Sequence, residues 1–116
     1  MKEKPAIATA IPRRRYRLGE FTITVLGDIN SKDGRDYRYI AAVICGQDPE
    51  PGLYLTAEPG GPGEEAGLAM RIVMQDGAEV IDRSQSWADL DAFVDEVLRI
   101  VSRLLKLTDE TPYRLM

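Results

Sequence analysis

Apolar and polar residues alternate with a period of two along several short segments in the first two thirds of the chain. In "YRLGEFTITVLG", residues 16–27, Phe21, Ile23 and Val25 alternate with polar side chains, which predicts a strand with one apolar face. The next segment, residues 28–36, is rich in Asn, Ser, Asp and Gly, which favour turns. We therefore expect a hairpin that leads into the following strand.

The next apolar run differs because it is apolar on both faces. Residues 37–46 read "YRYIAAVICG", which is typical of a central strand that is covered on both sides. Residues 53–58 predict a shorter third strand, and residues 59–67, with two prolines and four glycines, predict a surface loop. In the third strand, the alternation places Leu53, Leu55 and Ala57 inward and Tyr54, Thr56 and Glu58 outward.

A second hairpin is indicated by two apolar segments, residues 68–75 and 78–84, on either side of Asp76 and Gly77. An Asp-Gly pair favours a two-residue type I′ turn, since that turn needs positive φ at both central residues. We therefore predict that the two segments pair as antiparallel strands through this turn.

The segment 86–107, "SWADLDAFVDEVLRIVSRLLKL", has the period and the charge order of a helix. Ser86 is the predicted N-cap, with Asp89 three residues later as in a capping box. Its apolar residues cover about 180° of the circumference, whereas about 100° is enough to seat a helix on one sheet. Either a second subunit covers the excess, or a strongly curved sheet wraps the helix in a monomer. We expect a homodimer, with Trp87, Leu98 and Leu105 at the interface.

These elements predict an α+β fold, in which an antiparallel β-meander of about five strands is followed by one long C-terminal α-helix packed on the sheet. A chain of 116 residues is the usual size of a single domain. We place that domain at residues 16–108. Residues 1–15 are expected to form a basic, flexible arm, and residues 109–116 a loose tail.

The amino-acid composition excludes several kinds of catalytic and binding site. The chain has no histidine and one cysteine, so ordinary serine or cysteine triads and internal disulfides are excluded. Cys45 is expected to be a small buried apolar side chain. The segment "DINSKDG" lacks the glycine and the closing glutamate of a calcium loop, and "GGPGEEAG" lacks the lysine of a phosphate-binding loop. We therefore expect no cofactor, no metal and no enzymatic activity.

No segment has the length or apolar character of a secretory signal or a membrane span, so we expect a cytoplasmic protein without membrane contact. The net charge of -4 is unevenly distributed. Residues 1–17 hold six basic residues against one acidic residue, whereas residues 47–67 hold five acidic residues and no basic one. The basic arm therefore has two interpretations. It lies along the acidic segment, within one chain or across a dimer, or it binds a nucleic acid.

Two functions follow from these interpretations. The first is a small non-catalytic interaction module that self-associates or binds a protein partner. The alternative is single-stranded nucleic-acid binding, in which arginines and lysine follow the phosphates and tyrosines stack on bases. The residues of this alternative are Arg13, Arg14, Arg15, Lys32, Arg35, Tyr37, Arg38, Tyr39, Tyr54 and Arg71. A ligand or catalytic site between sheet and helix is a third hypothesis, which needs a pocket with convergent polar groups.

Overall fold

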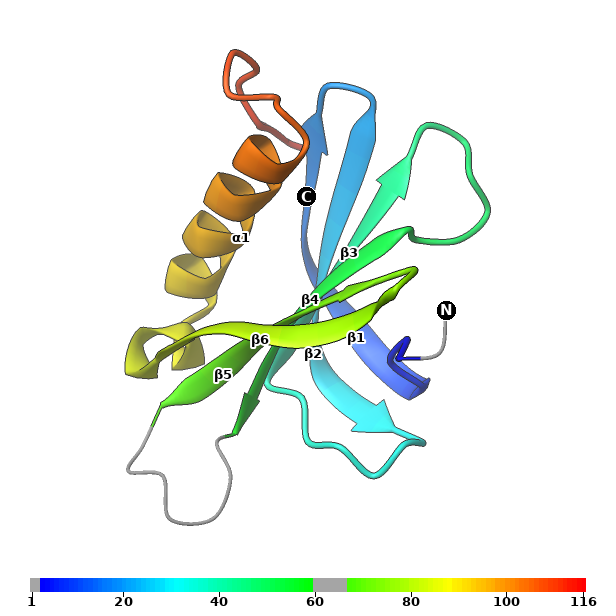
Figure 1. Cartoon of the computed structure of the whole chain (residues 1–116), viewed down its shortest axis with the longest axis vertical. Helices are drawn as coiled ribbons and strands as arrows, with labels where there is room; N and C mark the ends of the chain where they lie inside the picture. Colours follow the sequence, from blue (N-terminus) through cyan, green and yellow to red (C-terminus); the bar gives the residue numbers. More distant parts are fainter. Residues whose placement is uncertain (1–2, 60–66) are drawn as a thin grey trace.

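The computed structural model describes residues 3–59 and 67–116, and it shows one antiparallel sheet with one long helix packed on it (Figure 1). The strands are β1 (Ile7–Leu18), β2 (Phe21–Ser31), β3 (Tyr39–Cys45), β4 (Leu53–Pro59), β5 (Leu68–Met74), β6 (Gly77–Ser84) and β7 (Tyr113–Arg114). Their order in the sheet is β6-β5-β4-β3-β2-β1-β7, so the first six form a meander. The predicted α+β class and meander are confirmed, but the sheet has seven strands instead of about five.

The additional strands come from the two ends of the chain. Strand β1 includes residues 7–15, which we assigned to the arm, and β7 lies in the expected tail and pairs with β1 at Tyr16 and Arg17. The prediction of one strand over residues 16–27 is wrong, because a hairpin turn at Gly19 separates β1 from β2. Gly19 has a φ of 59°, which glycine adopts at the first central position of a type II′ turn.

The helix α1 (Leu90–Leu104) follows a short 3₁₀-helix, η1 (Gln85–Ala88). Asp89 is the N-cap of α1, and its carboxylate accepts a hydrogen bond from the backbone N–H of Ala92 at 3.0 Å. The prediction that Ser86 caps the helix is therefore wrong. Ser86 lies inside η1, where its N–H donates to the side chain of Ser84, so the preceding turn has its own cap.

The hairpin of β5 and β6 is confirmed, but its turn is not type I′. The central residues are Gln75 and Asp76, neither of which has positive φ, and Gly77 already pairs with Met74. Further along the hairpin, β6 contains one extra residue, because Arg71 pairs with Val80 and Met70 pairs with Asp82. Ile81 lies between these two pairs, which is the arrangement of a β-bulge.

Both faces of the sheet are covered. Helix α1 lies on one face, and the N-terminal segment lies on the side away from it (Figure 1). On the helix side, α1 buries Phe93 and Val97 completely against strands β2 to β5. On the other side, Tyr37, Tyr54 and neighbouring residues form a second core that Ile7, Leu26, Ile29 and Ala78 cover in part. Residues Tyr39–Val43 of β3 are buried throughout, so the prediction of a strand covered twice is confirmed.

Two predictions about exposure are wrong. Tyr54, Thr56 and Glu58 do face away from the helix, but they are buried because the second core and the polar groups beside it cover that face. Cys45 is exposed at the end of β3, where the chain turns away from the sheet. Of the helices in residues 3–59 and 67–116, none combines the length and the apolar character that crossing a membrane requires.

Candidate functional site: an apolar groove and an arginine pocket

The apolar stripe of α1 is largely covered by the chain's own sheet. Trp87, one of the expected interface residues, is only 5% exposed and belongs to the helix-side core. Leu98, the second, is partly buried against the same core. Within one chain, the sheet therefore already covers most of the stripe that a second subunit was expected to cover. Leu104 is the exception within α1, since 42% of its surface is exposed.

Leu104 borders an apolar pocket of about 260 Å³ between the C-terminal end of α1 and the sheet. The residues that line it are Phe21, Val43, Cys45, Gly52, Leu53, Met74, Leu104 and Leu105. Leu105 is the third expected interface residue, and it is partly buried here. Met74, which is also 42% exposed, belongs to the same lining, so the pocket carries two apolar side chains that water reaches.

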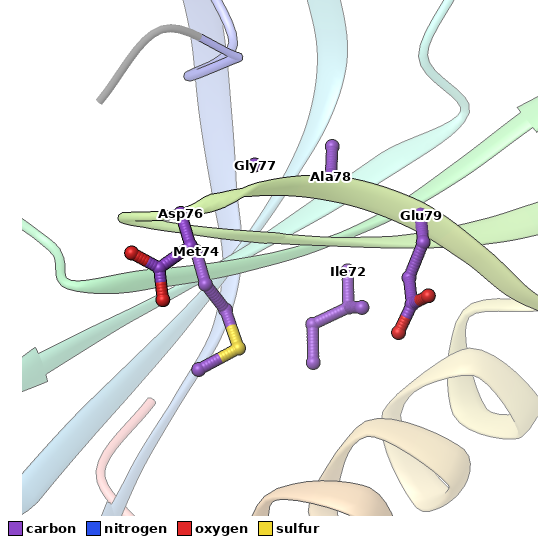
Figure 2. Close-up of a pocket in the computed structure, with 6 residues that line it drawn as sticks. All are labelled: Ile72, Met74, Asp76, Gly77, Ala78 and Glu79. Atoms are coloured by element: carbon purple, nitrogen blue, oxygen red, sulfur yellow. The ribbon is translucent and has the colours of Figure 1, made fainter.

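A second pocket, of about 290 Å³, shares Met74 with the first. Figure 2 shows the residues that line this second pocket. Ile72, Met74 and Glu79 point from the β5–β6 hairpin toward the side of the sheet that carries α1 (Figure 2). Asp76, Gly77 and Ala78 complete this pocket. We call the two pockets together the Met74 groove.

The rims of the Met74 groove carry opposite charges. Asp76 and Glu79 lie at the hairpin, and no basic residue is part of that pocket's lining. Arg103 and Lys106 flank Leu104 and Leu105 at the end of α1, and both are exposed. The groove is thus apolar in its centre, acidic at one rim and basic next to the other.

On the face away from α1, an ion-pair network occupies the region where we expected an exposed platform. Glu58 accepts hydrogen bonds from Arg71 Nε at 2.8 Å, from Thr56 Oγ1 at 2.6 Å and from Arg35 Nη1 at 3.0 Å. The side chains of Glu58 and Arg71 are only 10% and 8% exposed. Arg71 also lies 3.7 Å from a carboxylate oxygen of Glu3. The two buried charges are therefore paired within the chain, as buried charges must be.

The network continues through Tyr37. Arg71 Nη2 donates to Tyr37 Oη at 3.4 Å, and Tyr37 Oη donates to Asp33 at 2.7 Å. Burial raises the pKa of Tyr37 above its ordinary value, and the hydrogen bond to Asp33 raises it further. Slight burial raises the pKa of Asp33, but hydrogen bonds from Tyr37 and the N–H groups of Arg35 and Ala6 outweigh it and lower that pKa to about 2.

At the start of α1, three arginines surround a pocket of about 210 Å³, the arginine pocket. The residues that line it are Arg13, Arg14, Gly27, Asp28, Arg38, Tyr39 and Leu90. Arg13 pairs with Asp28, and Arg38 donates two hydrogen bonds to the carbonyl of Ala88 at 3.1 and 3.3 Å. Arg14 donates to the carbonyl of Arg13 at 3.0 Å, and its Nη2 lies 3.5 Å from Asp91.

The ten residues of the nucleic-acid hypothesis therefore do not form one surface. Four of them, Arg13, Arg14, Arg38 and Tyr39, line the arginine pocket. Three others, Arg35, Tyr37 and Arg71, belong to the ion-pair network on the opposite face, and Tyr54 is buried in the second core beside it. Arg15 and Lys32 are exposed elsewhere.

Sequence reasoning missed the buried pair of Glu58 and Arg71, because it placed Glu58 outward on its strand and Arg71 among the residues of a nucleic-acid-binding surface. A signal was present: Thr56 and Glu58 share one face of β4, and Thr56 is the cross-strand partner of Arg71. Three polar residues at adjacent cross-strand positions favour a hydrogen-bonded cluster. No group of three or more His, Cys, Asp or Glu residues suited to a metal ion is present in the part of the chain that the structure describes.

Comparisons with protein-family models, with curated proteins and with solved structures give no match for this chain. The proposals below therefore depend on the chain's own surfaces.

Proposed function

We propose that the protein is a small interaction module that self-associates through the Met74 groove. The observation that carries this proposal is the exposure of Met74 and Leu104 at the mouth of an apolar pocket of about 260 Å³. Apolar surface gathered around a hollow is stabilised by burial, at roughly 25 cal/mol for each Å² removed from water. Most of the helix stripe is already covered, so this end of α1 is where a second chain gains most.

A second copy of the chain is the partner whose charges match. In a two-fold symmetric pair, each patch faces the same patch of the other copy in the reverse direction. With an axis near Met74, the acidic rim of Asp76 and Glu79 in one copy meets Arg103 and Lys106 of the other. Opposite charges at the rim of an interface favour the correct partner and orientation. This charge order supports self-association over a partner of unrelated sequence.

The test is the molar mass in solution over a range of protein concentrations, measured by light scattering and by sedimentation. We expect the mass to rise from monomer to dimer in the micromolar range. Met74→Lys and Leu104→Lys should each shift the protein to monomer, because a charge cannot be buried in an apolar groove without a partner. Circular dichroism verifies that each variant is folded.

Val80→Lys is the matched control. Val80 is 49% exposed and lies on the same hairpin, but it pairs with Arg71 and borders a different pocket. The control variant should dimerise like the parent chain. A parent protein that stays monomeric at every concentration would contradict the proposal, as would a Val80→Lys effect as large as that of Met74→Lys.

Cys45 offers an independent measurement, because it is the only cysteine in the chain and lines the groove. A thiol reagent should react more slowly as the protein concentration rises, since the dimer covers Cys45. In the Leu104→Lys variant, the rate should not depend on protein concentration. A rate that is independent of concentration in the parent chain would place the interface elsewhere.

A further inference from the structure

We infer that the arginine pocket is a binding site for a phosphate group. Three guanidinium groups from two distant segments converge on it: Arg13 and Arg14 from β1, and Arg38 from the residue before β3. Guanidinium forks match the oxygen geometry of phosphate and hold it through paired hydrogen bonds. This site is separate from the Met74 groove, and the inference does not depend on self-association.

The arginines are held in place by bonds that leave other donors available. Arg38 is fixed by the Ala88 carbonyl through Nε and Nη2, and its guanidinium lies 5.3 Å from the centre of the Tyr39 ring. Its Nη1 has no partner among the described residues. Arg14 Nε is buried and also has no hydrogen-bond partner in the described part of the chain. A buried donor without an acceptor is costly, so a small shift of the partly exposed Arg14 side chain toward a phosphate oxygen would relieve this cost.

Gly27 is part of how this pocket is built. A Cβ atom at Gly27 would lie 3.1 Å from Arg13 Cγ and 3.2 Å from its Nε, so the glycine leaves the space in which Arg13 lies. The lining residues include one carboxylate, Asp28, which pairs with Arg13, and Asp91 lies beside Arg14 at 3.5 Å. Three cations against these two carboxylates leave the pocket with one excess positive charge, in a chain whose net charge is -4.

The geometry favours a single phosphate group over a stacked strand of nucleic acid. Tyr39 is 9% exposed, and its ring is stacked on Phe93 with centroids 5.4 Å apart. Its face is therefore occupied, and no other aromatic residue lines the pocket. Single-stranded binders need exposed rings for successive bases. A pocket of about 210 Å³ accommodates one phosphate group with a small attached moiety.

The experiment is a titration of the protein with inorganic phosphate. Binding is measured by calorimetry and by NMR, from the ¹H–¹⁵N signals of the arginine Nε–H groups. We expect a dissociation constant of about 1 mM or tighter, with a shifted and exchange-protected Nε–H signal of Arg14. Adenosine monophosphate should bind and adenosine should not. Inorganic phosphate should also displace any bound oligothymidylate, which distinguishes a phosphate pocket from a strand-binding surface.

Matched variants separate the pocket from simple charge. Arg14→Gln and Arg38→Gln should each weaken phosphate binding about tenfold, the loss expected for one charge-assisted hydrogen bond. Arg15→Gln removes the same charge from a neighbouring exposed residue whose side chain donates to Thr24 and does not line the pocket, and it should have no effect. Gly27→Ala should weaken binding without any change of charge, because it displaces Arg13.

Three results would contradict the inference of a phosphate-binding site. Equal losses in Arg14→Gln and Arg15→Gln would mean that net charge alone attracts phosphate. Binding of oligothymidylate that phosphate does not displace would indicate a strand-binding surface. No binding at millimolar phosphate, with the Arg14 Nε–H signal unchanged, would leave the pocket with an internal structural role only. Circular dichroism verifies the fold of each variant, so that a loss is not mistaken for unfolding.

Discussion

The buried pair of Glu58 and Arg71 provides a quantitative test of the structure. The change is Glu58→Leu, which removes the carboxylate but keeps most of the side-chain volume. The Arg71 side chain, which is 8% exposed, then stays buried. It loses the Glu58 carboxylate oxygen that accepts a hydrogen bond from its Nε at 2.8 Å. Removal of one partner from a buried ion pair costs about 3–5 kcal/mol, because the other charge is left without compensation.

The structure puts the expected loss at the lower end, about 3 kcal/mol. Arg71 retains the Glu3 carboxylate at 3.7 Å and the hydrogen bond to Tyr37 Oη at 3.4 Å. Arg71→Met should cost about 2 kcal/mol, because Glu58 retains its bond from Arg35. A domain of this length has about 6–17 kcal/mol of stability, so the single variants should still fold.

The double variant, Glu58→Leu with Arg71→Met, removes both buried charges but leaves the buried Thr56 hydroxyl without its acceptor, so it should cost about 2 kcal/mol. The coupling between the two sites is then about 3 kcal/mol. Urea unfolding followed by the fluorescence of Trp87 measures all four proteins. Trp87 is the only tryptophan and is 5% exposed, so its emission reports loss of the helix-side core.

Additive effects would refute this reasoning. If the double variant loses the sum of the two single losses within about 0.5 kcal/mol, the two side chains do not act as a coupled pair. A Glu58→Leu loss below about 1 kcal/mol would mean that water reaches this region and screens the charges. Arg15→Met, on an exposed arginine of β1, serves as the surface control and should change the stability by less than about 0.5 kcal/mol.

Three further predictions concern local features, each measured by chemical or thermal unfolding. Asp89→Ala should cost about 1 kcal/mol, while Ser86→Ala should change little, because the carboxylate of Asp89 caps α1; equal losses would contradict this. Gly19→Ala should cost about 1–2 kcal/mol because of the φ of 59°; an unchanged midpoint would show that the turn relaxes. The lowered pKa of Asp33, about 2 against 3.8, stabilises the fold fully above pH 4, and this stabilisation is lost as the pH falls toward 2. It amounts to less than about 1 kcal/mol at this exposed site, and Asp33→Asn should remove that part of the acid dependence.

Hydrophobic periodicity predicted the elements whose apolar residues recur without interruption. Helix α1, the central strand β3 and the β5–β6 hairpin all follow from such patterns. Strand β1 was missed along residues 7–15, because its register against β2 shifts at three places. Each shift interrupts the period of two, and the arginines and Pro12 gave the segment the composition of a solvated arm.

The candidate sites were harder to predict, because they depend on which residues meet across the sheet. Composition identified Arg13, Arg14 and Arg38 as basic, but only the pairing of β1 with β2, and of β2 with β3, brings the first two near the third. Hydropathy likewise assigns a charged residue such as Arg71 to the surface. Its burial follows from a partner 13 positions away in sequence, Glu58, which no local pattern contains.

The bulge at Ile81 bears on how the protein behaves at high concentration. Strand β6 ends the sheet in the described residues, with one strand neighbour, so its outer backbone groups resemble a template on which further chains can grow into fibrils. The extra residue breaks the regular spacing of those groups, and Asp82 and Arg83 place charges beside the break. Edge-to-edge addition of strands from other copies is thereby disfavoured along β6.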